Sequence, residues 1–249
     1  MGDPLRLYGL NALVLNAGSG IGEAVARTLV KHGATVLAVD TRNTGVEQRF
    51  SSVKSITGHT ANLVDADSMP VLVEEAAQKL GTIDILVNDF PLAFDAPMSD
   101  TGDKLERLLQ SRAALIMSIC RAALPHLKKS PAGRIINMGF LRSCFAASAN
   151  KAFESAEQDL ANLTRALAVE IGEFGITANY VQPGGVMTPG SRDVFRKEPT
   201  LRDHCIQGSA ARRLGEPVDI AKVALFLASD DAVFVSGTGV AVDGGRIYG

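Results

Sequence analysis

The sequence predicts an α/β fold in which a parallel β-sheet carries helices on both faces. Three observations support this. Short apolar segments of strand length alternate with longer segments of helix length. The strand-length segments are apolar throughout, as expected for strands that are buried on both faces. No Pro- or Ser-rich linker and no shift in composition divides the 249 residues, so we expect a single domain over residues 1–249.

The strands and helices expected from this alternation follow one another along the whole chain. Six segments have the character of buried strands: Ala12–Leu15, Thr35–Val39, Ile83–Val87, Arg134–Asn137, Thr177–Val181 and Gly239–Val242. Five segments have helical length: Ile21–Lys31, Asp67–Leu80, Leu105–Leu127, Ala149–Ile171 and Pro217–Leu227. Glycines typical of helix C-terminal caps stand before four of the strands, at Gly33, Gly81, Gly133 and Gly175. Short links between alternating strands and helices imply parallel pairing.

One interval, Thr188–Gly215, breaks this rhythm. It holds Pro189, Gly190, Pro199 and Gly208 among many charged residues, which predicts a mobile excursion with two short helices at most. Long excursions on α/β domains are typically functional, so we expect residues 188–215 to shape a substrate pocket. A solvated surface insertion is the alternative interpretation.

The composition excludes several classes of protein. With 25 basic and 27 acidic side chains and no basic cluster, the chain has no electrostatic signature of a nucleic-acid partner. It has no uncharged apolar run long enough to span a membrane, and its first residues do not resemble a secretory signal. Its three widely spaced cysteines predict neither a disulfide framework nor a metal site. A cytoplasmic location is therefore expected.

A glycine-rich turn between the first strand and the first helix predicts a dinucleotide site of the Rossmann type. Its expected contacts are Asn16, Gly18, Ser19, Gly20, Ile21 and Gly22. The glycines let the backbone approach a pyrophosphate, and the helix start supplies N–H groups and partial positive charge. Asp40 ends the second strand, where a carboxylate accepts hydrogen bonds from a ribose diol and repels a 2′-phosphate, which favours NAD(H) over NADP(H). Arg42 weakens this preference without reversing it, and a tight turn without a ligand is the alternative.

The chain resembles the short-chain dehydrogenase/reductase family over essentially its whole length. The motifs that carry the resemblance are Gly18–Gly22, Ile83–Asn88, Gly133–Asn137, Leu163–Ala168, Pro183-Gly184 followed by Thr188, Arg213–Pro217 and Val242–Gly245. The resemblance implies a seven-stranded sheet in the order 3-2-1-4-5-6-7, a nicotinamide cofactor, a small-molecule substrate and a homo-oligomer, either tetramer or dimer. It also implies cofactor contacts at Asn62, Leu63, Asn88, Lys151, Pro183, Gly184, Val186 and Thr188.

The cofactor side of the pattern departs from the family at three places. Asn16 replaces the family's first glycine, which is a mild change because asparagine tolerates left-handed backbone geometry. Asn62 replaces an aspartate that in the family contacts adenine. Phe90 and Pro91 add bulk and a fixed φ angle after the fourth strand. We therefore expect binding of the cofactor to be weakened.

The catalytic pattern departs further. The family uses an asparagine, a serine, and a tyrosine and lysine four residues apart, with the tyrosine acting as acid or base. Here Lys151 is assigned to the lysine position, and the other three positions fall on Arg112, Phe140 and Ala147. The segment from Phe140 to Ala147 is also about six residues shorter than usual. A positioned general acid contributes about 10²- to 10⁴-fold, so carbonyl reduction with the usual roles is not expected.

Three other residues are candidates for the missing chemistry. Arg112 suits an anionic ligand or an acidic partner, and Asp89 is the expected partner in an ion pair. Cys144 lies in the shortened segment, but a lone cysteine is more often a small buried residue. Tyr180, on the sixth strand, is either a replacement acid or a core aromatic residue.

Three functions remain open at this point. The first is an NAD(H)-dependent oxidoreductase with a rebuilt active site, in which Lys151 holds the ribose and Thr188 the carboxamide. Hydride addition to an activated C=C bond would suit the missing tyrosine best. The second is a non-redox enzyme on the same scaffold, and the third is an inactive paralogue that acts as a binding or regulatory subunit. The retained Gly20, Asp40 and Thr188 favour the first.

Overall fold

A seven-stranded parallel sheet forms the centre of the molecule. The computed structural model describes residues 6–41, 44–90, 103–139 and 151–246, apart from the side chains of 103–110 and 151–154. Its strands are β1 (Asn11–Leu15), β2 (Thr35–Asp40), β3 (Ile56–Thr60), β4 (Ile85–Asn88), β5 (Arg134–Met138), β6 (Thr177–Pro183) and β7 (Gly239–Val242). They pair in the order β3-β2-β1-β4-β5-β6-β7, which confirms the predicted fold class and strand order.

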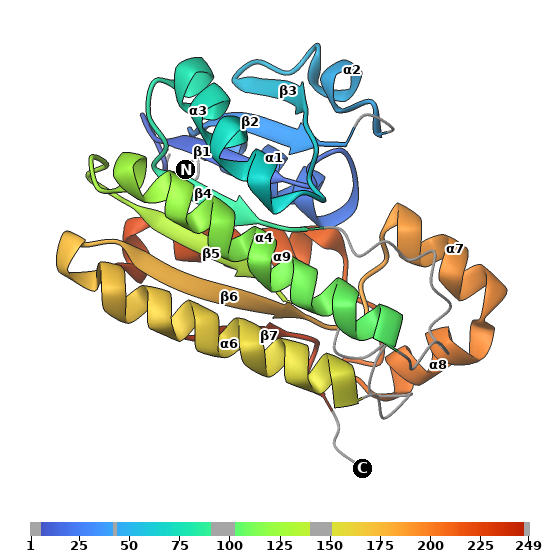
Figure 1. Cartoon of the computed structure of the whole chain (residues 1–249). Coiled ribbons are helices and arrows are strands. Elements are labelled where there is room, and N and C mark those ends of the chain that lie inside the picture. The colour runs from blue at the N-terminus through green and yellow to red at the C-terminus, as the bar shows by residue number, and fades with distance from the viewer. Residues whose placement is uncertain (1–5, 42–43, 91–102, 140–150, 247–249) are drawn as a thin grey trace.

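Helices cover both faces of the sheet. They are α1 (Gly20–Lys31), α2 (Val46–Phe50), α3 (Met69–Leu80), α4 (Asp103–Leu127), α6 (Lys151–Ile171), α7 (Pro189–Lys197), α8 (Pro199–Gln207) and α9 (Pro217–Ala228). The apolar side chains of α3, α4 and α6 pack on one face, and those of α1 and α9 pack on the other. In Figure 1, α4 and α6 lie in front of the sheet, while α7 and α8 stand beyond its carboxyl edge.

The pleat of β1 shows why the inner strands are apolar on both faces, whereas the edge strand β7, expected to be buried, has no buried residue. Ala12 and Val14 point into the cluster formed with α1 and α9, whereas Leu13 and Leu15 point into the cluster under α3, α4 and α6. All four side chains are fully buried. Because successive strand residues face opposite sides, a strand between two helical layers needs an apolar residue at every position.

Neither the strand β3 nor the short helix α2 is among the segments expected from the sequence. β3 is an edge strand, and only its first residue, Ile56, is buried. The rest of the strand contains Gly58 and polar residues, so it lacks the continuous apolar run of the inner strands. Pairing with β2, in which Val36 aligns with Ile56, makes this segment a strand, because the partner strand supplies the hydrogen bonds.

The excursion over residues 188–215 contains two short helices, α7 and α8. Its base is closed by backbone hydrogen bonds from Met187 N to the Gly215 carbonyl at 2.9 Å and from Gly215 N to the Gly185 carbonyl at 2.8 Å. Thr188 and Ser191 form a reciprocal capping box at the start of α7. The predicted helices are therefore present, and the mobility of the excursion stays a prediction. Within the described part of the chain, no helix is long and apolar enough to cross a membrane.

Candidate active site

The turn after β1 has the geometry that the glycine pattern predicts. Asn16 adopts a left-handed conformation with φ of 53°, and Gly20 has φ of 59°. A Cβ atom on Gly22 would overlap the Asn16 carbonyl group, so only glycine allows the helix to start this close to the strand. Ser19 precedes α1 in an extended conformation, and its side chain makes no capping hydrogen bond. The N–H groups at the start of α1 thus form a site suited to a phosphate.

Asp40, at the end of β2, is connected to this turn. Its Oδ2 accepts a hydrogen bond of 2.7 Å from Gly18 N, and its Oδ1 accepts one of 2.6 Å from Thr41 N. The side chain is 1% exposed. Each carboxylate oxygen has a second lone pair, but Thr44 packs beside it: a Cβ atom on Gly18 would lie 2.6 Å from Thr44 Oγ1 and 2.7 Å from Asp40 Oδ2, so a ribose reaches the carboxylate only when Thr44 moves aside. The glycine turn and this carboxylate together fit the diphosphate and the adenosine ribose of a dinucleotide.

The structure also brings Thr188 to the turn, although the two are far apart in the sequence. A Cβ atom on Gly20 would lie 3.4 Å from Thr188 Cβ and Cγ2. Two neighbouring predicted contacts have clear packing roles: Gly184 donates from its N–H to the Val242 carbonyl at 2.9 Å, and Val186 is fully buried. Pro183 ends β6. Thr188, Pro183 and Gly184 therefore border the same edge of the sheet as the glycine turn.

Of three other predicted contacts, Leu63 and Asn88 point into the protein and Asn62 lies at the surface. The Leu63 side chain is fully buried in the core under α3 and α4. Asn88 is also buried, and its Nδ2 donates to Asn137 Oδ1 at 2.9 Å. Asn62 is exposed, and its Oδ1 accepts a hydrogen bond from Val64 N at 3.1 Å. Any contact of Leu63 or Asn88 with a ligand must therefore use backbone atoms.

Phe90 does not add bulk to the groove. Its side chain is 2% exposed and belongs to the apolar cluster under α3 and α4. The expectation that Phe90 obstructs the cofactor groove is therefore wrong: its apolar ring is buried in the core, away from water. Pro91 lies outside the described residues.

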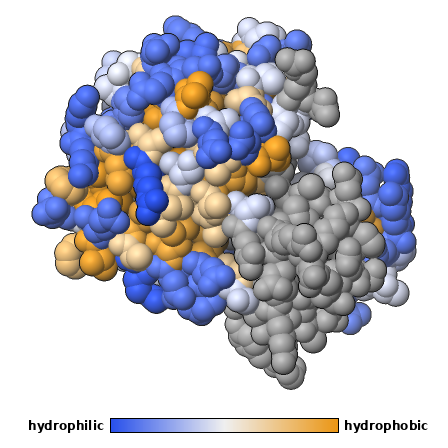
Figure 2. Space-filling model, viewed as in Figure 1, coloured by the Kyte–Doolittle hydropathy of each residue, from blue (hydrophilic) through white to orange (hydrophobic). Residues whose placement is uncertain are grey.

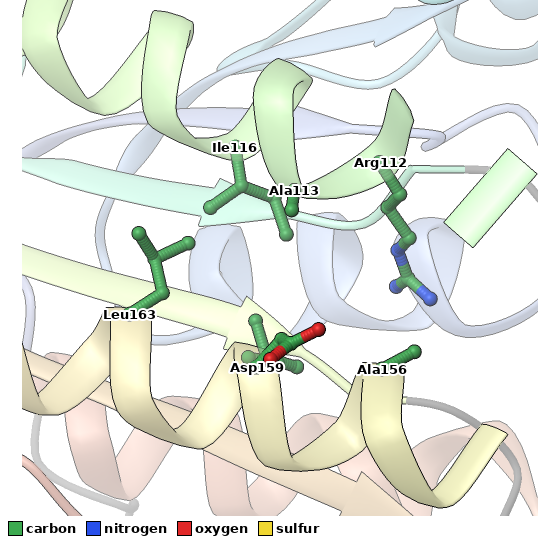
Figure 3. Close-up of a pocket in the computed structure, with 7 residues that line it drawn as sticks. Arg112, Ala113, Ile116, Ala156, Asp159 and Leu163 are labelled. Carbon is green, nitrogen blue, oxygen red and sulfur yellow. The ribbon is translucent and has the colours of Figure 1, made fainter. Parts of the chain in front are cut away.

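Arg112 extends from α4 toward Ala156 of α6, as Figure 3 shows. Its side chain is buried, and its Nη2 donates to the Met138 carbonyl at the end of β5 at 2.6 Å. Burial lowers the pKa of Arg112, and the charges of Asp89 and Glu157 oppose this shift. The expected Asp89 partner is therefore electrostatically coupled to Arg112, and direct contact between the two stays a prediction.

Asp89 follows β4 and connects Arg112 to the glycine turn. Its Oδ2 accepts a hydrogen bond of 3.2 Å from Asn16 Nδ2. Burial raises the pKa of Asp89, while the charge of Arg112 and the Asn16 hydrogen bond act to lower it. This contact gives Asn16 a role that a glycine at the same position could not fill.

Glu157 is a candidate that the sequence analysis missed. It projects from α6, and its Oε1 accepts a hydrogen bond of 2.9 Å from Gln182 Nε2 on β6. The signal that could have found Glu157 is the segment from Phe140 to Ala147, which is about six residues shorter than usual in the family. If the usual spacing from Phe140 is restored, the tyrosine position moves from Ala147 to Phe153 and the lysine position moves from Lys151 to Glu157.

The remaining catalytic candidates lie at the margin of the site or outside the described residues. Lys151 is the first residue of α6, and its side chain is not among those described, so its predicted role stays a prediction. Cys144 lies outside the described residues. The Tyr180 ring packs directly over Gly239 of β7 and against the core, which agrees with the core-aromatic interpretation. Within the described part of the chain, no group of acidic, histidine or cysteine side chains could hold a metal ion.

Comparisons with known proteins agree with this architecture. Residues 16–246 match the family model described as Enoyl-(Acyl carrier protein) reductase. The chain is 30% identical to 7alpha-hydroxysteroid dehydrogenase of Escherichia coli (98% of this chain, 97% of that protein). It is 26% identical to the 3-oxoacyl-(acyl-carrier-protein) reductase of Thermotoga maritima (98% and 100%) and 29% identical to D-beta-hydroxybutyrate dehydrogenase of Rhizobium meliloti (94% and 97%).

A solved structure shows the same fold. The ligand-free aldohexose dehydrogenase of Thermoplasma acidophilum superposes with a TM-score of 0.83 at 21% identity, over 98% of this chain and 96% of that one. Together with the family model and the relatives that match along nearly their full length, the glycine turn and the seven-stranded sheet lead to one assignment. The chain is an oxidoreductase that belongs to the short-chain dehydrogenase/reductase family.

Proposed function

We propose that the chain is an NAD(H)-dependent oxidoreductase with a non-standard active site that acts on a small organic substrate. The observation that carries the proposal is the Asp40 carboxylate at the glycine turn, where Gly18 N lies 2.7 Å from Asp40 Oδ2. A carboxylate at this place accepts hydrogen bonds from a ribose diol and repels a 2′-phosphate, which favours NAD(H) over NADP(H). When bound, the cofactor supplies or accepts the hydride.

The chain's own residues restrict the chemistry on the substrate side. Phe140 cannot donate a hydrogen bond, and neither Ala147 nor Phe153 offers the hydroxyl group of a tyrosine. A substrate oxygen would therefore lack the usual proton donor and one stabilising hydrogen bond. Hydride addition to an activated C=C bond, or its reverse, demands less proton transfer to oxygen, so we favour such a substrate.

We also propose a homo-oligomer. Figure 2 shows apolar residues over α4 and α6 on the face turned to the viewer. Val169, on α6, is 81% exposed, and a contiguous exposed apolar surface is typical of a protein–protein interface. A tetramer or a dimer built from copies of this chain would cover this surface. The cytoplasmic location expected from the sequence stays a prediction.

Titration with NADH, followed by its fluorescence, tests the proposed function. The wild-type protein should bind NADH more tightly than NADPH, and Asp40→Ala should weaken NADH binding about tenfold or more because the diol loses its acceptor. Asp67→Ala, which removes an exposed carboxylate, is the matched control and should bind like the wild type. Absence of binding at about 1 mM NADH, a concentration well above typical cofactor affinities, would overturn the proposal.

A further inference from the structure

We propose that Thr44 competes with the cofactor for the Asp40 carboxylate, so that displacement of Thr44 limits the affinity for NAD(H). The inference rests on the proposed function and deepens it, because it names the residue that an adenosine ribose must replace. Three observations carry it: the approach of Thr44 to Asp40, the glycine that makes this approach possible, and the hydrogen bonds that keep Thr44 in its place.

Thr44 lies between β2 and α2, beside the carboxylate that ends β2. A Cβ atom built on Gly18 would be 2.6 Å from both Cβ and Oγ1 of Thr44 and 2.7 Å from Asp40 Oδ2. Because one point is this close to both side chains, Thr44 Oγ1 and Asp40 Oδ2 are near neighbours. A ribose hydroxyl that donates to Oδ2 has to lie about 2.7 Å from it. Thr44 therefore takes up part of the space that the ribose needs.

Gly18 is required for this approach, and its backbone angle does not explain it. Gly20 has a left-handed backbone with φ of 59°, whereas Gly18 is not among the residues with a positive φ. The backbone at Gly18 would therefore accept an alanine. The Cβ atom of that alanine, however, would overlap both Thr44 and Asp40 Oδ2. The glycine thus makes room for Thr44 within the protein itself, in addition to any room it leaves for a pyrophosphate.

Two hydrogen bonds hold Thr44 in this place. Its N–H donates to the Thr41 carbonyl at 3.2 Å, and its Oγ1 donates to the same carbonyl at 3.0 Å. The chain then enters α2, which is anchored because Val46 is fully buried. A threonine hydroxyl has one proton to donate, and the Thr41 carbonyl receives it. Thr44 therefore fills space beside Asp40 without donating a hydrogen bond to its carboxylate.

A ribose hydroxyl does donate to the carboxylate, and this charge-assisted hydrogen bond favours the displacement of Thr44. The cofactor binds only to the fraction of molecules in which Thr44 has moved, so the observed Kd is the intrinsic Kd divided by that fraction. One neutral hydrogen bond changes such an equilibrium about threefold to tenfold. Thr44→Ala removes Oγ1 together with its hydrogen bond to the Thr41 carbonyl, and we expect it to raise the competent fraction by this factor.

Isothermal titration calorimetry with NADH tests the competition. Thr44→Ala should lower the Kd about threefold to tenfold relative to the wild type. Thr44→Ser keeps the hydroxyl and its hydrogen bond to the Thr41 carbonyl, so its Kd should stay within about twofold of the wild type. In an Asp40→Ala background, Thr44→Ala should no longer tighten binding, because the carboxylate for which the two groups compete is gone. Thermal unfolding establishes that each variant is folded.

Thr35→Ala is the matched control, since Thr35 is an exposed threonine at the other end of β2, about 16 Å from Asp40 along the strand. It should leave the Kd unchanged. If the wild type binds NADH and Thr44→Ala binds it no more tightly, the inference is wrong while the proposed function stands. Weaker binding by Thr44→Ala, which would make Thr44 a contact of the cofactor, also overturns it, as does a gain that persists without Asp40. If neither the wild type nor Thr44→Ala binds NADH, the proposed function fails as well.

Discussion

The backbone N–H of Gly18 donates a hydrogen bond of 2.7 Å to Asp40 Oδ2, so the residue expected to hold a ribose also holds the turn expected to hold a diphosphate. Thr41 N donates to the other carboxylate oxygen at 2.6 Å. Asp40 therefore shapes the glycine turn before any ligand arrives. A substitution at this position affects both the stability of the fold and the affinity for the ligand.

Asp40→Ala should lower the free energy of unfolding by about 1–3 kcal/mol, because two backbone N–H groups near a buried carboxylate lose their acceptor. Urea unfolding followed by circular dichroism measures this loss. Asp40→Asn keeps an acceptor oxygen and should lose less. An alanine variant as stable as the wild type would show that these two hydrogen bonds do not support the turn.

Asp89 should make stability depend on pH. Burial raises the pKa of Asp89 above its ordinary value of 3.8, so its favourable contribution is present below that value and is lost as pH rises through the higher folded pKa. Asp89→Asn should therefore gain stability relative to the wild type as pH rises above the ordinary carboxyl pKa of 3.8. Urea unfolding across this range provides the measurement. The exposed Asp193→Asn serves as control, and a gap that shrinks as pH rises would contradict the prediction.

Two assignments of the missing tyrosine and lysine can be distinguished by restoration. One set of substitutions, Phe140→Ser, Phe153→Tyr, Glu157→Lys and Arg112→Asn, rebuilds the family pattern at its usual spacing. The other, Phe140→Ser with Ala147→Tyr, rebuilds it around Lys151. We expect the first set to gain carbonyl reductase activity about 100-fold or more above the wild type, because a positioned acid contributes at least that much.

Consumption of NADH with a panel of small ketones measures this gain. The second set should stay at the wild-type level. If only the second set is active, the family's lysine position belongs to Lys151 and not to Glu157. Thermal unfolding of each variant establishes that an inactive protein is folded.

Cys120 should be chemically inert in the native protein. Its side chain is buried beside Asn88, whose Nδ2 donates to Sγ at 3.3 Å, and burial raises the pKa of the thiol to about 12. Only the thiolate reacts with alkylating reagents. Iodoacetamide at neutral pH should therefore modify Cys120 in urea but not in buffer, as peptide mass spectrometry would show. Rapid native labelling of Cys120 would mean that the core between α4 and the sheet opens readily.

The sequence by itself determined the fold class, the glycine turn and the strand order that the family resemblance implied. The fold class and the turn rest on local signals, since apolar runs in buried strands, amphipathic helices and a strand–turn–helix motif are all encoded within about 20 neighbouring residues. The strand order, in contrast, came from the resemblance along the whole chain. The edge strand β3 was not predicted because pairing with β2, and not its own composition, makes Ile56–Thr60 a strand.

Only the tertiary structure decided how the ends of the strands combine into a site. Asn16 and Asp89 meet across the switch point, and Glu157 reaches Gln182 and the field of Arg112 from a different helix. These residues are separated by tens of positions, so no local pattern reports their contact. The Phe90 side chain shows the same limit, since the packing under α3 and α4, and not its place after β4, draws the ring into the core.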